Sequence, residues 1–380
     1  MAIQPHFQEG GYSMASPDVL DSLKRMGIDI LNTANNHAMD YGIGGLIATN
    51  KYLDEKQIIH FGTRVNLAEA SMAKFVDTSN GRIAVIGITS SFHDSYAAGH
   101  QNQDMQGRPG VAPLKHKAIY GLTEEYYNQL VNIANISGIN CYHSKAKVDG
   151  YLPADANFKF GSFEFVQNKE NTLHTYPDAN DMQRTERIVR DAARRSDMTI
   201  VSLHSHQFRN GDNRLPAEFM ELFCRKCIDV GAQVIFCHGP HHIRGIERYK
   251  DGIIFHGLGN FIFQHEDMDL VPEELYCRYN MSQCTSDGIG ELMDIRNDHG
   301  NRGLSINPAT WQSFIPSLSY SETGIKVSLY PIELIHDSMR GLRGLPRLTK
   351  DLSVLEELQE LSTAYSTKIK IDKKRGIAFV

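Results

Sequence analysis

The densest group of side chains that could bind a metal ion or transfer a proton is the segment TANNHAMDYG, residues 33–42. It holds Asn35, Asn36, His37 and Asp40. The amide oxygen of Asn36 is a usable ligand that adds no negative charge, and His37 can then stay free to protonate a leaving group. Two alternatives stay open here. The segment could be a plain strand-to-helix turn, where asparagine is tolerated, and Asp40 could cap the helix that follows.

Two later segments carry pairs of histidines, and each pair follows an apolar run. Neutral imidazole is the commonest transition-metal ligand in proteins, so His238 and His241 could direct nitrogens at one or two ions. The chain leaves the predicted strand between His204 and His206, so we expect His204 in the site and His206 at its rim. A polar loop with scattered histidines is the alternative, because the chain holds 17 histidines.

Short apolar runs must position these groups, and we predict them to be buried strands at 28–31, 199–203 and 234–236. Strands that end in polar side chains are how open α/β folds build sites. A further buried strand is predicted at 82–89, and strands at 58–61, 158–166 and 324–334. Helices are predicted at 17–26, 44–56, 121–136, 181–195, 216–230 and 352–365.

A hairpin over 245–263, turning at Asp251 and Gly252, leads into Gly259 and Asn260. Asn260 could line the site, or the Gly-Asn pair could be a turn that lets backbone pass close to it. We predict one domain over 1–380 of class α/β, with polar insertions at about 91–110, 140–180 and 265–315.

Composition excludes several classes of protein. Apolar residues make up 41% and charged residues 22%, as in globular proteins. The net charge of -6 and the lack of a long basic block argue against a nucleic-acid surface. No stretch is long enough to be a membrane span, and the start carries no secretory leader, so the chain as written predicts a cytoplasmic protein.

Cys224 and Cys227 form a CxxC spacing inside a predicted amphipathic helix, with no second CxxC nearby. We interpret them as buried helix thiols rather than as zinc ligands or a redox pair.

Four motifs occur in one order along the chain: TANNHAMDYG, VSLHSHQ, GAQVIFCHGPHHIRGIERYKDG and GLGNFIF. Together they resemble the CapA family of poly-gamma-glutamate capsule synthesis proteins, over roughly residues 15–370. The resemblance implies a calcineurin-like metallophosphoesterase fold, a four-layer αββα sandwich with a dinuclear metal site at the strand ends.

The resemblance also implies roles for single residues. Asn36, His204 and His238 match the ligands of one ion, His241 matches a ligand of the other, and His37 matches the possible general acid. The side chains of Asn35, Asp40, His206 and Asn260 would line the site. Asn and His ligands fit manganese, zinc or iron.

The chain departs from the family pattern at several places. The family opens with a strand carrying an early Asp and a second acidic motif, and neither precedes the Asn-Asn-His segment here. The resemblance therefore implies an N-terminally truncated chain, whose missing segment could place it at the cell surface, or an incomplete site with a doubtful second ion. Gly239 stands where a histidine is frequent, Ser205 where an aromatic is common, and His206 where glycine is usual.

Two functions follow as expectations. The first is a metal-dependent hydrolase or transferase linked to poly-gamma-glutamate capsule biosynthesis, which acts on an anionic polymer or a phosphoester. It would use a metal-bound hydroxide as nucleophile and His37 as general acid. The second is a non-catalytic accessory protein that binds a polyanion through an incomplete metal site.

Overall fold

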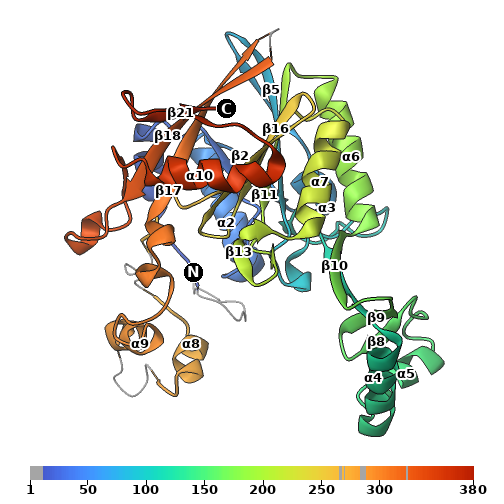
Figure 1. Ribbon diagram of the computed structural model, residues 1–380. Coiled ribbons are helices and arrows are strands. Elements are labelled where there is room, and N and C mark those ends of the chain that lie inside the picture. Colours follow the sequence, from blue (N-terminus) through green and yellow to red (C-terminus); the bar gives the residue numbers. More distant parts are fainter. Residues whose placement is uncertain (1–11, 265–267, 269, 283–287, 322–323) are drawn as a thin grey trace.

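Two β layers packed face to face form the centre of the protein (Figure 1). The computed structural model describes residues 12–264, 268, 270–282, 288–321 and 324–380. The first layer is a six-stranded sheet in the order β15 (Ile243–Tyr249), β16 (Gly252–Leu258), β14 (Val234–His238), β11 (Met198–His204), β5 (Gly81–Thr89) and β4 (Lys74–Thr78). The four central strands run parallel, so their carboxyl ends lie at one edge of the sheet.

Two helices, α6 (Ala179–Ala193) and α7 (Glu218–Asp229), cover the outer face of this sheet. Their apolar stripes bury side chains such as Phe219 and Phe223 against Leu203 and Ile235 of the strands. Cys224 and Cys227 lie in the same core with 0% and 1% of their surface exposed, which confirms the interpretation as buried helix thiols.

The inner face of the sheet packs against the second β layer. Part of that layer is an antiparallel sheet of β17 (Gln312–Ser321), β18 (Gly324–Leu334), β19 (Pro346–Leu348), β20 (Lys370–Asp372) and β21 (Ile377–Phe379), flanked by α10 (Ser353–Ser362). The rest is the parallel pair β1 (Ile30–Asn32) and β2 (Ile59–Phe61), which lies over β5. A Cβ on Gly87 of β5 would come within 2.4 Å of Asn32 Oδ1, so only glycine allows this approach.

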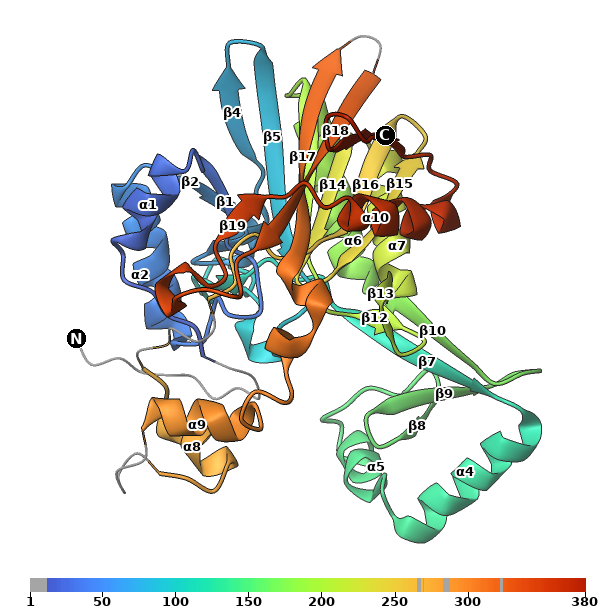
Figure 2. The same cartoon turned by 60° about the vertical axis from the view of Figure 1, so that its left-hand side comes forward.

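Helices α1 (Val19–Arg25) and α2 (Gly42–Glu55) pack outside the β1–β2 pair through Leu20 and Leu53 (Figure 2). The layers are therefore helix, sheet, sheet and helix. The structure confirms the mixed α/β class that the alternation of predicted strands and helices indicated.

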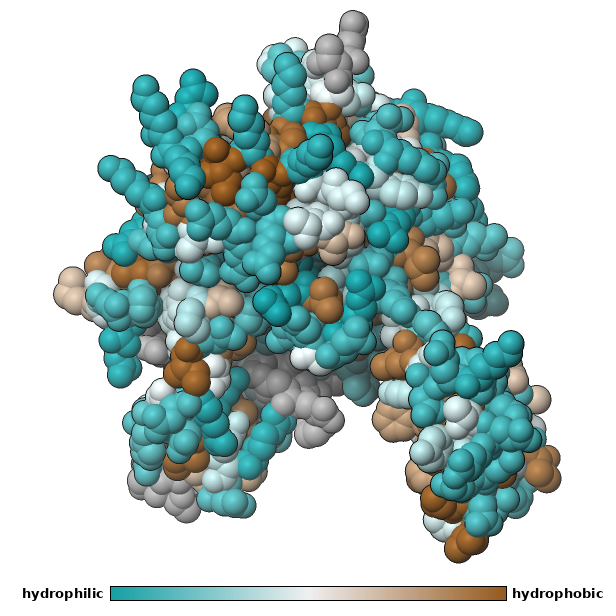
Figure 3. Space-filling view, in the orientation of Figure 1, coloured by the Kyte–Doolittle hydropathy of each residue, from teal (hydrophilic) through white to brown (hydrophobic). Residues whose placement is uncertain are grey.

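A lobe over residues 116–177 projects from the sandwich (Figures 1 and 2). It consists of β7 (His116–Leu122), α4 (Glu124–Ser137), α5 (Cys141–Val148), β8 (Phe158–Phe160), β9 (Phe163–Gln167) and β10 (Thr172–Pro177). The predicted insertion at 140–180 covers its second half. Tyr142, Val148 and Tyr151 are each more than four-fifths exposed, and Figure 3 shows apolar surface at the outer end of the lobe.

The other two predicted insertions contain packed elements. Segment 91–110 buries Ala98 against Leu67 of α3 (Leu67–Ser71), and the short pair β3 (Thr63–Arg64) and β6 (Gly110–Val111) closes it. The described part of 265–315 holds α8 (Glu273–Arg278) and α9 (Ile289–Arg296), which share a small core. No helix in the described part of the chain is long and apolar enough to span a membrane.

Three histidines away from the strand ends predict a pH dependence of stability. Burial lowers the pKa of His60, His116 and His256 below the ordinary value of about 6.5. The unfolded chain then binds these protons first, so the free energy of unfolding should fall as the pH drops below about 6.5. Each histidine adds a slope of up to about 1.4 kcal/mol per pH unit.

Urea denaturation at a series of pH values between neutral and mildly acidic measures this slope. His116→Phe is the matched control, because His116 stacks on Phe219 with ring centroids 4.3 Å apart and phenylalanine keeps that contact. The variant should lose stability less steeply as the pH falls. An identical slope in both proteins would contradict the contribution of His116.

Candidate metal centre

Segments from three distant parts of the chain meet between the two β layers, at the carboxyl ends of β1, β11 and β14. His204 and His238 end neighbouring parallel strands and are register partners. Asn36 follows β1 in the opposite layer, and its Oδ1 lies 3.0 Å from His204 Nε2. The fold therefore brings together an amide and an imidazole that are 168 positions apart.

His238 contacts the other ring nitrogen of His204, since the two Nδ1 atoms are 3.1 Å apart. Its Nε2 lies 2.9 Å from Ser202 Oγ and 3.4 Å from Asn32 Nδ2. As these side chains stand, the donors of Asn36, His204 and His238 do not converge on one point. In the described ranges, no group of three or more His, Cys, Asp or Glu side chains is arranged to hold an ion.

His206 lies inside the histidine cluster, where the sequence predicted a rim position. Its Nε2 is 3.2 Å from His204 Nε2, and its ring centroid is 5.4 Å from that of His241. The chain leaves β11 after His204, as predicted, and the Ser205 N–H donates to the His238 carbonyl at 2.8 Å. The N–H of His206 donates to Ser91 Oγ at 2.8 Å, which helps to hold this residue next to His204.

His241 and Asn260 form the far side of the cluster. Asn260 Oδ1 is 2.8 Å from His241 Nδ1, and its Nδ2 donates to the Thr310 carbonyl at 2.9 Å. Gly259 has φ +77°, and a Cβ there would come within 2.7 Å of the Gln312 carbonyl oxygen. Both sequence interpretations of the Gly-Asn pair therefore hold, since the turn passes close to backbone and presents Asn260 to His241.

His37 and Asp40 form a pair beside the cluster. His37 Nδ1 lies 2.8 Å from Asp40 Oδ2, and the same oxygen accepts the Ser13 N–H at 2.7 Å. Asp40 is 1% exposed, whereas the His37 side chain is 39% exposed. The alternative of a helix cap was wrong, because α2 begins after Tyr41 without a side-chain cap. Asn35 Oδ1 accepts the His37 N–H at 2.8 Å, which stabilises the turn.

Burial keeps the histidines of the cluster neutral. It lowers the pKa of His204 well below its ordinary value, and it lowers the pKa of His206 and of His238 to about 4. Burial also lowers the pKa of His241, against the opposing hydrogen bond with Asn260. Neutral imidazoles with free lone pairs are the form that binds metal ions.

A cavity of about 510 Å³ lies at the base of the projecting lobe. Ser90 lines it, and the Ser90 N–H donates to the His204 carbonyl at 2.9 Å. Charged side chains of both signs face it, among them Asp94, Lys115 and Lys117.

Several residues of the centre escaped the sequence analysis. Ser202 and Asn32 face His238 from a strand interior and a strand end, and nothing in their spacing distinguishes them. Gln207 accepts hydrogen bonds from Ser90 and Ser205 and so fixes the loop that carries His206. For Gln207, the feature of the sequence that could have indicated a role is the polar run Ser205, His206 and Gln207 directly after a predicted strand.

The two β layers and the site between their strand ends define a metallophosphoesterase-like α/β protein. Residues 6–265 match the family described as bacterial capsule synthesis protein PGA_cap. The chain is 30% identical over 380 residues to the uncharacterized protein y4sH of Sinorhizobium fredii, which covers 97% of this chain and 80% of that protein.

Two Bacillus proteins align over shorter stretches. The capsule biosynthesis protein CapA of Bacillus anthracis is 24% identical over 249 residues, which is 66% of this chain and 43% of that protein. The PGA biosynthesis protein CapA of Bacillus subtilis is 25% identical over 242 residues, which is 63% of this chain and 44% of that protein. The chain belongs to the bacterial capsule synthesis (CapA) family, which confirms the resemblance seen in its motifs.

Proposed function

We propose that this chain is a metal-dependent hydrolase or transferase of capsule biosynthesis. The observation that carries the proposal is the contact of Asn36 Oδ1 with His204 Nε2, inside a cluster of neutral imidazoles next to the His37–Asp40 pair. Neutral donor atoms about 3 Å apart, with no positive charge among them, are surroundings that favour a cation.

The donor set fits a divalent ion. Two ligands bonded at about 2.0–2.2 Å to one ion lie roughly 3.0–3.4 Å apart, and the two contacts of His204 Nε2, with Asn36 and His206, are 3.0 and 3.2 Å. Asn36, His204 and His238 would hold the ion, with His241 toward a second one. A bound manganese, zinc or iron ion would supply an activated water and polarise the scissile bond.

The charge of the site supports an anionic substrate. In the described part of the chain, no carboxylate hydrogen-bonds to His204, His206, His238 or His241. Neutral ligands leave the charge of the ion uncompensated, so phosphate or carboxylate oxygens would bind there favourably. The Bacillus subtilis relative is named a PGA biosynthesis protein, and we extend poly-gamma-glutamate, or a phosphoester in its synthesis, to this chain as the substrate class.

His37 is suited to act as the general acid. Its Nδ1 is held by the buried Asp40, which fixes the ring and leaves Nε2 without a hydrogen-bond partner among the described residues. The side chain of His37 is 39% exposed, so Nε2 can deliver a proton to the departing oxygen of a bound substrate. Asp40 thus acts as a positioning residue for His37.

A non-catalytic accessory protein that binds a polyanion is the second candidate. The lack of a carboxylate among the imidazoles, within the described ranges, favours it, because a bridging carboxylate would strengthen the binding of two ions. This candidate predicts that the protein binds anionic polymer with no turnover.

Metal analysis of purified protein tests the proposal, with a His204→Ala, His238→Ala double variant as the comparison. We expect close to one ion in the wild type and a loss of most of it in the variant. A model phosphoester assay with added manganese should show turnover in the wild type alone. Equal, near-zero metal in both proteins would end the enzyme proposal and leave the accessory one.

A further inference from the structure

His206 is held at the centre of the histidine cluster by contacts on both sides of it. Its own N–H donates to Ser91 Oγ at 2.8 Å. The next carbonyl, that of Gln207, accepts a hydrogen bond from Nη2 of Arg244 at 3.1 Å, and Arg244 is 0% exposed. The loop is therefore bound to Ser91 before His206 and to the buried Arg244 after it, and these contacts fix the position of the His206 side chain.

His204 Nε2 is shared between two neighbours. It lies 3.0 Å from Asn36 Oδ1 and 3.2 Å from His206 Nε2. One nitrogen carries at most one hydrogen, so it cannot donate to both neighbours at once. Two donor atoms about 3 Å from a third are, however, spaced like ligands of a common ion. Asn36 Oδ1, His204 Nε2 and His206 Nε2 are therefore better placed to bind one ion than to form hydrogen bonds with one another.

His238 meets His204 from a different direction. It contacts Nδ1 of His204, the nitrogen that does not face Asn36, and its own Nε2 is engaged by Ser202 Oγ at 2.9 Å. These contacts tie His238 to the strand layer. Its position suits a residue that orients the His204 ring, as the outer partners of metal-bound histidines do.

Gly239 leaves the room that this arrangement needs. A Cβ at Gly239 would lie 3.0 Å from His204 Cε1 and 3.2 Å from His204 Nε2, and the residue has φ +115°. A side chain at this position would press on the edge of His204 that faces Asn36 and His206. Glycine at this position therefore leaves the Nε2 edge of His204 open to Asn36 and His206.

We propose that His206, with Asn36 and His204, holds the metal ion, and that His238 positions His204 instead of binding the ion through the same set. The proposal rests on the proposed function, because it assigns ligands to the ion proposed there. In the expected ligand set, His206, which follows β11, takes the place of His238, which ends the adjacent strand β14.

Titration with Co²⁺ and with Mn²⁺ tests the proposal in wild type and in His206→Ala, His206→Gln and His238→Ala variants. Visible absorption of bound Co²⁺ reports its ligands, and the electron paramagnetic resonance signal of free Mn²⁺ gives the affinity. The loss of an orienting partner such as His238 typically weakens metal binding about 10–100-fold. We expect His206→Ala and His206→Gln to weaken binding more than His238→Ala does and to change the Co²⁺ spectrum. His238→Ala should weaken binding less and keep the number of nitrogen ligands.

His60→Ala serves as a control for the loss of a buried histidine outside the cluster, since His60 is 2% exposed, and circular dichroism shows which variants fold. Wild-type binding in His206→Gln, together with lost binding in His238→Ala, would overturn the ligand exchange and leave the proposed function intact. No binding of either ion by the wild type would instead reject the proposed function, and with it the ligand assignment.

Discussion

Replacing His37 with alanine should slow the hydrolysis of phosphoesters with poor leaving groups by about 10²–10⁴-fold. His37 Nδ1 is bound to Asp40 at 2.8 Å, so its Nε2 is the nitrogen available for proton transfer. An alkyl alcohol leaves only with a proton, whereas a nitrophenolate leaves without one. The same variant should therefore hydrolyse a nitrophenyl ester at close to the wild-type rate. Initial rates on the two esters, measured with manganese present, give this comparison directly.

Asp40→Asn tests the second half of the dyad. An amide in place of the carboxylate no longer favours the required tautomer of His37, so the variant should slow the alkyl ester and spare the nitrophenyl ester, as His37→Ala does. Metal content measured in parallel should stay unchanged, because neither residue is a proposed ligand. An equal slowing of both esters by His37→Ala would instead mean that the histidine acts on binding or on the ion, and would remove it as the acid.

The strands that carry the centre could be predicted from the sequence because their residues are buried or partly buried and form short, mostly apolar runs. Ile30–Asn32, Met198–His204 and Val234–His238 each lie within a few residues of the predicted spans. Side chains at the ends of parallel strands of one sheet must be neighbours, so the meeting of His204 with His238 follows from the pattern.

The details inside the cluster depend on contacts that no local pattern carries. The place of His206 depends on Ser91, Gln207 and Arg244, which come from three parts of the chain. The role of Asp40 depends on which group its carboxylate binds. The sequence alone does not distinguish a carboxylate that caps a helix from one that binds His37. The start of the projecting lobe at His116 could not be predicted from the sequence. It depends on the pairing of β7 with β10, which are about 50 residues apart in the chain, and no local pattern indicates that pairing.

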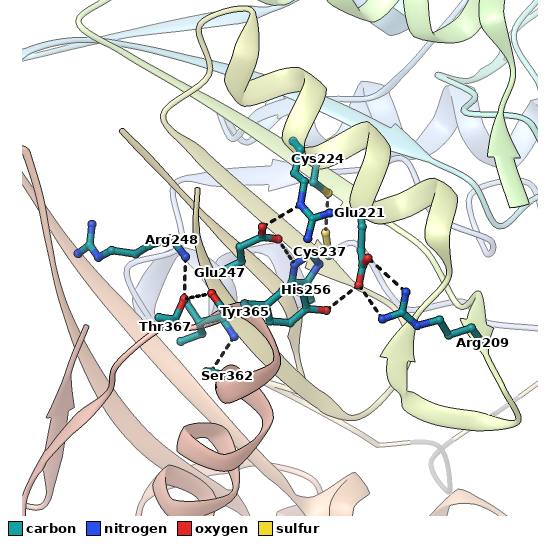
Figure 4. A network of polar contacts seen from close by, with 12 residues as sticks. Arg209, Glu221, Cys224, Cys237, Glu247, Arg248, His256, Ser362, Tyr365 and Thr367 are labelled. Atoms are coloured by element: carbon teal, nitrogen blue, oxygen red, sulfur yellow. Dashed lines mark hydrogen bonds and ion pairs between the residues drawn. The ribbon is translucent and has the colours of Figure 1, made fainter. Parts of the chain in front are cut away.

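Glu247→Ala should lower the free energy of unfolding by about 3–5 kcal/mol, because it removes the acceptor of a buried charged network. Glu247 on β15 is 5% exposed and binds Arg225 of α7 at 2.8 Å. It also binds His256 of β16 at 3.0 Å (Figure 4). Burial alone would raise the pKa of Glu247, but the hydrogen bonds from His256 and Arg225 outweigh it and lower the pKa. The carboxylate is therefore charged at neutral pH, and its loss leaves both donors without an acceptor.

Urea denaturation of the wild type and of Glu247→Ala measures this loss, with Asp77→Ala as the matched control. Asp77 binds Arg82 at 2.6 Å, but the two side chains are 69% and 45% exposed, so this loss should stay below about 1 kcal/mol. Both pairs join an arginine Nε to a carboxylate, and the Glu247 carboxylate is far less exposed than that of Asp77, so the difference between the variants measures what the burial of the carboxylate adds. A Glu247→Ala, His256→Ala double variant completes the cycle. If Glu247 stabilises the fold through His256, the double variant loses less than the sum of the single ones. Strictly additive losses would show that the carboxylate acts through Arg225 alone.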